Sequence, residues 1–354
     1  MSDARSGAGA PRRILLIQTA FLGDMVFTTP LIRTARERFP RAELAVLATP
    51  AAAQVLHHNP RVDRVLVDDK RGKDRGWAGY RRVRGRVRAF APDLVLSPHK
   101  SLRSGLLARA AGARERIGFR TGLARFCYTR TVPFDPAEPL FVERHLALAR
   151  ALGWPVPSTA TEVFPAAADR ERVAARLSEE GIAAEARLCG VSFGSVWATK
   201  QWPGEYYAAL GDRLATTLGW RVLLLGSEAE RAASEAIAAR MTTAPVNWTG
   251  RLDIPGLIAL CERLHLHLGG DSGGAHIARA AGTPAVTLFG PTREDIFAPT
   301  PRDLVLFRTP PCRPCGPHGH RRCPTGTHEC MGELTPDLVF EKIQAFAATL
   351  PPRP

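Results

Sequence analysis

The chain has 354 residues, 45% of them hydrophobic and 23% charged, a composition that excludes an intrinsically disordered protein. Its length exceeds one ordinary core, so two domains of roughly 150 residues each are expected. The net charge of +14 favours an anionic partner: nucleic acid, an anionic membrane face or a phosphorylated substrate. No apolar run approaches the ~18 residues of a membrane span, and the basic start reads as a frayed terminus, not a signal peptide.

The first half of the chain alternates between strands and helices, which predicts a parallel sheet covered on both faces. Short apolar runs predict strands at 13–18, 42–49, 62–68, 92–98 and 115–119. Helical patterns lie between them at about 24–38, 50–58, within the arginine-rich segment 70–88, and at 101–112. This half therefore predicts one doubly wound domain.

A proline-rich stretch from 131 to 165 surrounds one helical pattern and predicts a linker. A second alternation follows, with strands expected at 188–193, 221–226, 244–248, 264–269 and 285–290. We expect domains at 1–160 and 161–354, and a final helix over 336–350 that could cross back to the first domain. Open α/β sheets bind ligands at the carboxyl ends of their strands, so a cleft between two such domains is the expected site.

Residues 70–88 hold nine basic residues and one acid. One hypothesis places this segment near anionic lipid or a phosphorylated acceptor. A solvated arginine-rich helix face explains it equally well. A nucleic-acid-binding protein is the alternative from another class, although no nucleic-acid motif accompanies the charge.

The stretch GGDSGGAHIARAAGTP, residues 269–284, carries four glycines between a strand and a helix. Bare backbone at a helix N-terminus offers N–H groups to phosphate, although a tight turn is the simpler explanation of glycines alone. Polar loops follow other strands as well. Asp24 follows the first strand, and Lys200 lies in the loop GSVWATKQWP of the second domain.

These motifs together carry a family resemblance. The segments GDMVFTTPLIRTARERFP, ATKQWP, GDSGGAHIARAAGTPAVTLFGPT and the cysteine-rich tail resemble glycosyltransferase family nine, the lipopolysaccharide heptosyltransferases. The tail is most similar to the heptosyltransferase II branch. The resemblance implies a GT-B enzyme with two Rossmann-like domains, the acceptor held mainly by the first and the nucleotide sugar mainly by the second.

The implied reaction is inverting transfer of heptose from ADP-L-glycero-D-manno-heptose to the inner core of lipopolysaccharide, with a lipid A-Kdo-heptose type acceptor. Transfer to another surface glycan or to a protein stays open. The resemblance implies no cofactor for catalysis, no nucleic-acid partner, and a cytoplasmic enzyme that is peripheral at the inner face of the inner membrane. An anionic membrane surface is then a further partner.

The resemblance also implies residue roles. Asp24 matches the catalytic base, although a helix N-cap is its plainer role. Lys200 matches a lysine on the donor phosphates, which gives it both catalytic and donor-binding roles, and a surface lysine is the alternative. The other implied donor-binding residues are Ser195, Glu230, Asp271, Ser272, Gly273, Gly274 and His276. Glu228 is an alternative to Glu230, and Gly274 replaces a larger family residue.

Four cysteines crowd the segment 310–332, namely Cys312, Cys315, Cys323 and Cys330. Cys312 and Cys315 have a spacing typical of metal ligands, which makes a closed structural metal site one hypothesis. The second pair is more widely spaced than in ordinary zinc ribbons. Reduced free thiols are the other hypothesis, and disulfides are disfavoured because the compartment is expected to be reducing.

Overall fold

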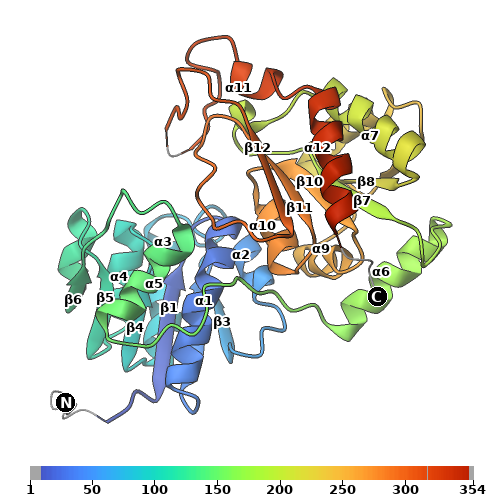
Figure 1. The fold of residues 1–354 in the computed structure, drawn as a ribbon. Coiled ribbons are helices and arrows are strands. Elements are labelled where there is room, and N and C mark those ends of the chain that lie inside the picture. The colour runs from blue at the N-terminus through green and yellow to red at the C-terminus, as the bar shows by residue number, and fades with distance from the viewer. Residues whose placement is uncertain (1–8, 317, 351–354) are drawn as a thin grey trace. The chain divides into compact units, whose positions relative to one another are not determined.

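The computed structural model describes residues 9–316 and 318–350. The chain divides into two compact units, Met1–Phe164 and Pro165–Pro354, whereas the sequence analysis placed the division between residues 160 and 161. Each unit is built on one parallel sheet with helices between its strands (Figure 1). The doubly wound α/β class predicted from the sequence is therefore confirmed.

The first unit has a six-stranded sheet in the order β3-β2-β1-β4-β5-β6, with every pair parallel. Its strands are β1 (Arg13–Gln18), β2 (Glu43–Ala48), β3 (Arg64–Val67), β4 (Leu94–Ser97), β5 (Glu115–Phe119) and β6 (Arg130–Val132). The strand order reverses between β1 and β4, where doubly wound sheets bind their ligands. Polar residues that follow these two strands are therefore candidates for the ligand site of this unit.

The helices of the first unit cover both faces of its sheet. They are α1 (Leu22–Arg38), α2 (Pro50–Val55), α3 (Gly76–Phe90), α4 (Leu102–Ala110), the short 3₁₀ helix η1 (Leu123–Cys127) and α5 (Phe141–Ala151). Val83 of α3 and Leu107 of α4 share one buried core with Leu15 and Ile17 of β1. Helices α1 and α5 pack together over the sheet in Figure 1. No helix in the described residues combines the length and apolarity that crossing a bilayer requires.

The second unit repeats this topology with the order β12-β11-β10-β7-β8-β9, also parallel throughout. Its strands are β7 (Leu188–Ser192), β8 (Arg221–Leu225), β9 (Val246–Asn247), β10 (Leu266–Gly270), β11 (Ala285–Phe289) and β12 (Asp303–Phe307). The order reverses between β7 and β10. The loops after these strands are therefore expected to carry this unit's site.

The helical elements of the second unit are α6 (Ala167–Glu179), η2 (Ala198–Lys200), α7 (Gly204–Leu218), η3 (Glu228–Glu230), α8 (Arg231–Ala238), α9 (Ile254–Cys261), α10 (Gly273–Ala280), α11 (Glu329–Gly332) and α12 (Pro336–Thr349). Phe340 and Ile343 of α12 lie in the core of this unit, and α12 packs against α7. The apolar face of this helix is therefore buried within the second unit, and a crossing back to the first domain stays a prediction.

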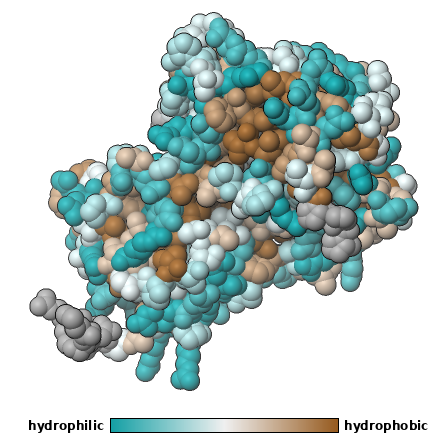
Figure 2. Space-filling model, viewed as in Figure 1, coloured by the Kyte–Doolittle hydropathy of each residue, from teal (hydrophilic) through white to brown (hydrophobic). Residues whose placement is uncertain are grey.

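The sequence analysis predicted neither the short helical segments η1, η2, η3 and α11 nor three longer or sheet-forming elements, β6, α6 and β12. Strand β6 has three residues and lies in the proline-rich stretch that predicted a linker. Helix α6 buries only Val173 and Leu177, so its periodic signal is weak. Strand β12 is an edge strand whose first three residues stay partly exposed. Figure 2 shows a hydrophobic patch of surface in the region of β12.

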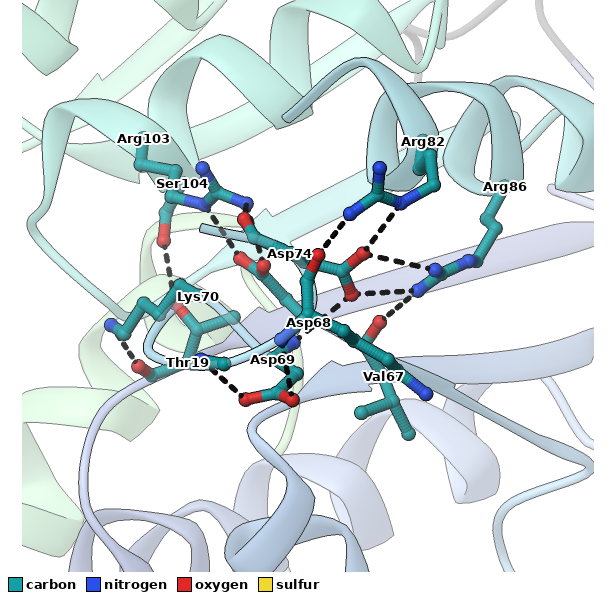
Figure 3. A network of polar contacts seen from close by, with 12 residues as sticks. Thr19, Val67, Asp68, Asp69, Lys70, Asp74, Arg82, Arg86, Arg103 and Ser104 are labelled. Atoms are coloured by element: carbon teal, nitrogen blue, oxygen red, sulfur yellow. Dashed lines mark hydrogen bonds and ion pairs between the residues drawn. The ribbon is translucent and has the colours of Figure 1, made fainter. Parts of the chain in front are cut away.

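Two buried carboxylates fix the arginine-rich part of the first unit (Figure 3). Asp68 follows β3, is fully buried, and accepts two hydrogen bonds from Arg103 of α4, at 2.8 and 2.7 Å. Asp74, also fully buried, pairs with Arg82 and Arg86 of α3. These three arginines are therefore structural, and a solvated helix face describes only the remaining ones.

We expect Asp68→Asn to lower the free energy of unfolding by about 2 kcal/mol, because it removes the charge that two hydrogen bonds from Arg103 satisfy. Urea denaturation measures this change. Glu43→Gln is the matched control, since Glu43 pairs with Arg64 on the surface and should cost less than about 1 kcal/mol. Equal losses in the two variants would contradict a special role for the buried pair.

Candidate functional site

The central feature of the second unit is the carboxylate of Asp271, which follows β10 directly. Lys200 forms an ion pair with its Oδ2 through Nζ. His276 of α10 lies with Nε2 3.4 Å from Oδ1, and Thr292 donates to Oδ2 at 3.0 Å. The three predicted residues Lys200, Asp271 and His276 therefore lie together, and they are joined by Thr292, which the sequence analysis did not single out.

Asp271 keeps its charge although it is buried. Burial by itself would raise the pKa of this carboxyl. The hydrogen bond from His276 and the charge of Lys200 outweigh that effect and hold the pKa far below its usual range. Asp271 is thus a fixed anion that orients an ammonium and an imidazole at the end of the strand.

Helix α10 begins beside this cluster. Ser272 is its N-cap residue, yet the Ser272 side chain makes no capping hydrogen bond. Gly273 and Gly274 form the first turn, so backbone N–H groups are exposed there without bulky side chains. This end of α10 offers N–H donors, a hydroxyl that caps no helix N–H and a positive dipole end to an anion.

Gly274 has a packing reason that the sequence did not reveal. A Cβ at this position would lie 2.9 Å from Oγ of Ser192, whose hydroxyl is hydrogen-bonded to Nε2 of His267 at 2.9 Å. His267 is fully buried, and burial lowers its pKa to about 4, so its imidazole is neutral. The Ser192–His267 pair therefore fills the space that a larger residue at 274 would need. Ser192 and His267 are polar residues within otherwise apolar strands, and this pattern is the sequence signal that could have indicated the pair.

Ser195 and Glu230 lie in neighbouring loops of the same sheet edge. The carboxylate of Glu230 accepts from the Ser227 backbone at 2.6 Å and lies so close to Gly194 that a Cβ there would be 1.5 Å from Oε1. Glu228 instead pairs with Arg231 at the surface. Of the two candidate glutamates, Glu230 is the one that faces the loop carrying Ser195.

The cysteine-rich segment holds the loop that carries Lys200. The Thr199 hydroxyl accepts from the His320 backbone N–H at 2.7 Å, and the Thr199 carbonyl lies 2.8 Å from Nε2 of His328. Trp197 stacks on His318, with the rings 6.1 Å apart and nearly parallel. The segment therefore fixes the residues that directly precede Lys200.

Arg313 extends this contact to the loop after β11. Its buried guanidinium donates to the carbonyls of Gly290 and Thr292, both at 2.7 Å, and pairs with Glu294. Thr292 in turn donates to Asp271. The cysteine-rich segment thus supports the Asp271 cluster from two directions, a role that no local motif indicated.

The four cysteines themselves are free thiols. Burial raises the pKa of Cys330 to about 11, whereas a hydrogen bond from Thr325 and backbone N–H groups lower that of Cys323 to about 7. Within 9–316 and 318–350, no three of these sulfur atoms lie within 4.8 Å of one another. The thiols are neighbours, but as placed they do not form a ligand set for a metal.

Asp24 lies in the first unit, at the edge where β1 ends. Helix α1 begins at Leu22 with Phe21 as its N-cap residue, so the expectation that the helix starts near Asp24 is wrong by one half turn. Asp24 is the third helical residue, and its Oδ2 accepts the Phe21 backbone N–H at 3.2 Å. This bond uses one carboxylate oxygen, and Oδ1 makes no hydrogen bond to any other described residue.

The charge of Asp24 acts on two lysines of the first unit. Burial lowers the pKa of both Lys70 and Lys100, and the charge of Asp24 opposes that shift in each. His145 of α5 is buried and hydrogen-bonded through Nδ1 to the Thr28 hydroxyl at 3.2 Å. Burial lowers its pKa, so it is a neutral packing residue beside the Asp24 carboxylate.

A second polar group at this edge was not predicted. His99 follows β4, and its Nδ1 lies 3.0 Å from the Thr19 hydroxyl and 2.9 Å from that of Ser104. Burial lowers the pKa of His99 to about 4. The run Pro98–Ser101 follows a predicted strand just as Asp24 does, so the same rule would have found it.

Comparison with known proteins identifies the family of this chain. The family model for glycosyltransferase family 9 (heptosyltransferase) matches residues 80–328. Lipopolysaccharide heptosyltransferase 1 of Pseudomonas aeruginosa is 28% identical over 86% of this chain and 86% of its own, and lipopolysaccharide heptosyltransferase 2 of Escherichia coli K12 is 27% identical over 94% and 98%. The solved structure of E. coli ADP-heptose lipopolysaccharide heptosyltransferase II superposes with a TM-score of 0.78, at 24% identity, over 95% of this chain and 98% of that one.

The two Rossmann-like units and this superposition define the GT-B fold that the sequence predicted. The family match covers more than half of the chain, so the protein belongs to glycosyltransferase family 9, the heptosyltransferases. The prediction of the family from the sequence is confirmed.

We expect Thr199→Val to loosen the cysteine-rich segment, because valine keeps the shape of threonine but cannot hydrogen-bond to His320. Loss of these bonds should raise the population of the opened segment about tenfold. Trypsin cleavage after the exposed Arg321 and Arg322, followed by mass spectrometry, measures this opening.

Thr216→Val is the control for that experiment, since the Thr216 hydroxyl bonds only a carbonyl within the exposed side of α7. Its cleavage rate should match that of the unchanged protein. Unaltered cleavage of the Thr199 variant would show that this contact does not hold the segment.

Proposed function

We propose that this enzyme transfers heptose, with inversion, from ADP-L-glycero-D-manno-heptose to the inner core of lipopolysaccharide. The observation that carries the proposal is the cluster of Lys200, Asp271 and His276 beside the bare N-terminus of α10. These groups are suited to a nucleotide diphosphate, because a cation and a helix N-terminus can both approach its charge.

The donor would be held by residues from four loops. Ser272, Gly273 and Gly274 donate to phosphate, and Glu230 receives the ribose beside Ser195. Asp271 and His276 contact the sugar. The ammonium of Lys200 moves from Asp271 to the diphosphate as ADP departs, and Asp271 stays satisfied meanwhile because Thr292 and His276 still hold it.

In the transfer step, an acceptor hydroxyl oxygen forms a bond to the anomeric carbon while the bond from that carbon to the β-phosphate oxygen breaks. The hydroxyl proton passes to Asp24, and ADP leaves with the electron pair. Oδ1 of Asp24 is the oxygen suited to take the proton, since Oδ2 already accepts from the helix start.

The acceptor would be a lipid A-Kdo-heptose type glycolipid. Lys70 and Lys100 beside Asp24 support an acceptor with negative charge. We place the enzyme in the cytoplasm, peripheral at the inner face of the inner membrane, where such a lipid would be met.

We expect Asp24→Asn to lower kcat about 10³-fold, because the amide cannot take the proton. Its oxygen can still accept from Phe21, so the helix start is preserved and the affinity for ADP should change less than about twofold. A coupled assay with ADP-heptose and a truncated core acceptor gives kcat, and calorimetry with ADP gives the affinity.

Lys200→Met is the complementary variant in this assay. It should weaken ADP binding about tenfold, because a charged hydrogen bond to phosphate is lost. Exposed Lys342 lies on α12, and Lys342→Met should change neither quantity. Full activity of the Asp24 variant would reject Asp24 as the base, and an absence of turnover with any ADP-sugar would reject the donor.

We further propose that catalysis needs no metal and that the clustered cysteines act as reduced thiols packed behind Lys200. Treatment with EDTA should then leave kcat unchanged, and the purified protein should carry no stoichiometric zinc or iron by mass spectrometry. A metal that copurifies with the protein and disappears in Cys323→Ser, but not in Cys127→Ser, would instead establish a structural metal site at this segment.

A further inference from the structure

Exposed apolar side chains concentrate on three elements of the first unit. Large apolar residues are usually buried, yet these stand out into solvent. They are Trp77 of α3, 70% exposed, Leu102 and Leu106 of α4, 44% and 38% exposed, and Leu123 and Phe126 of η1, 67% and 64% exposed. We call these five residues the apolar patch.

The members of the apolar patch are neighbours. Trp77 stacks on Tyr80 at 5.3 Å, and the Tyr80 hydroxyl donates to the Leu106 carbonyl at 3.4 Å. Leu102 and Leu106 are four residues apart on α4 and therefore share one side of it. Helix α4 also packs closely on η1, since a Cβ at Gly105 would lie 3.1 Å from Cβ of Ala124. The elements that carry the patch are thus in contact, α3 with α4 and α4 with η1.

Arginines border the apolar patch without acidic partners. An open groove of about 550 Å³ runs between α3 and α4, lined by Tyr80, Arg84, Arg88, Leu106, Arg109 and the small residues 110–112. Arg81, Arg84, Arg88 and Arg109 form no ion pair with any residue in the described part of the chain. Asp93 is the one acid in the stretch 75–114, and it accepts from the backbone of Arg12 and Arg13 instead.

The base of this surface is rigid (Figure 3). Asp68 binds Arg103 of α4, and Asp74 binds Arg82 and Arg86 of α3. The two helices are thereby tied to the loop after β3. The apolar side chains are held in place before any partner arrives, and the arginines that stay unpaired are those beside them.

Part of the apolar patch lies at the edge of the first sheet that carries Asp24. Helices α3 and α4 begin after β3 and β4, and η1 follows β5, so Trp77, Leu102 and Leu123 lie toward the carboxyl edge of the first sheet. Asp24 follows β1 at that same edge. A partner seated on the apolar patch would therefore approach the side of this unit that carries Asp24.

We propose that the apolar patch and its arginines dock this unit on an anionic lipid bilayer. Aromatic and leucine side chains enter the interface between headgroups and acyl chains, while guanidinium groups bind lipid phosphates. A second copy of the chain fits poorly, because a symmetric contact would bring unpaired arginines against one another. The inference rests on the proposed function in one respect: the enzyme would bind a bilayer because its proposed acceptor is a glycolipid.

Vesicle cosedimentation tests the dock without donor or acceptor, which keeps it separate from the proposed function. The vesicles contain phosphatidylcholine with about 30% phosphatidylglycerol, or phosphatidylcholine alone. The triple variant Trp77→Ser, Leu123→Ser, Phe126→Ser should bind anionic vesicles at least about tenfold more weakly. Val196→Ser is the control, since Val196 is 79% exposed on the second unit.

A second pair of variants tests the charge. Changing Arg81, Arg84, Arg88 and Arg109 to Gln should weaken binding to anionic vesicles at least about tenfold and abolish its salt dependence. The control changes Arg41, Arg187, Arg221 and Arg240 to Gln, which removes the same charge from other exposed positions. Circular dichroism and ADP affinity should stay unchanged in all variants.

Three outcomes would overturn the proposal. Unchanged vesicle binding by the triple variant would exclude the apolar patch as the docking surface. Equal losses of vesicle binding in the two arginine variants would show that net charge, and not the position of the arginines, determines binding. A native dimer by light scattering that becomes a monomer in the triple variant would show that a second copy covers the patch. Failure to transfer heptose would leave the vesicle result standing and would reject only the proposed function.

Discussion

The second unit is organised around one buried ion pair, that of Lys200 with Asp271. An isolated carboxylate at this depth would be too costly, so every neighbour of Asp271 compensates its charge: an ammonium, an imidazole and a hydroxyl. Because the carboxylate has several partners, one of them can be released to a substrate without leaving a bare charge. The same interaction thus stabilises the loop arrangement and, in the proposed mechanism, supplies the cation that moves to the donor.

The arrangement of Lys200 depends on residues far away in the sequence. The cysteine-rich segment contacts Thr199 through His320 and His328, and Arg313 fixes the loop of Thr292. Among residues 310–316 and 318–328 of this segment, none lies in a helix or strand. Its order comes from these polar contacts and from the loops on which it lies.

The first unit uses charge in two distinct ways. Arg82, Arg86 and Arg103 form ion pairs with buried aspartates and stabilise the loop after β3. Arg81, Arg84 and Arg88, on the same helix, stay free to meet an anionic surface. A single arginine-rich segment therefore holds a loop in place and presents a basic face, and the position of each residue on α3 decides which of the two it does.

The sequence by itself determined the α/β class, most strands, the family and the strand-end loops, because apolar runs, glycine-rich turns and motif spacing are local signals. It did not reveal α6, β6 or β12, whose stability comes from neighbours and not from their own pattern. Only the tertiary structure decided that Glu230 faces Gly194 while Glu228 turns to Arg231, and that Ser192 and His267 account for Gly274. Those contacts join residues from separate strands, and no local spacing encodes which side chains the folded sheet brings together.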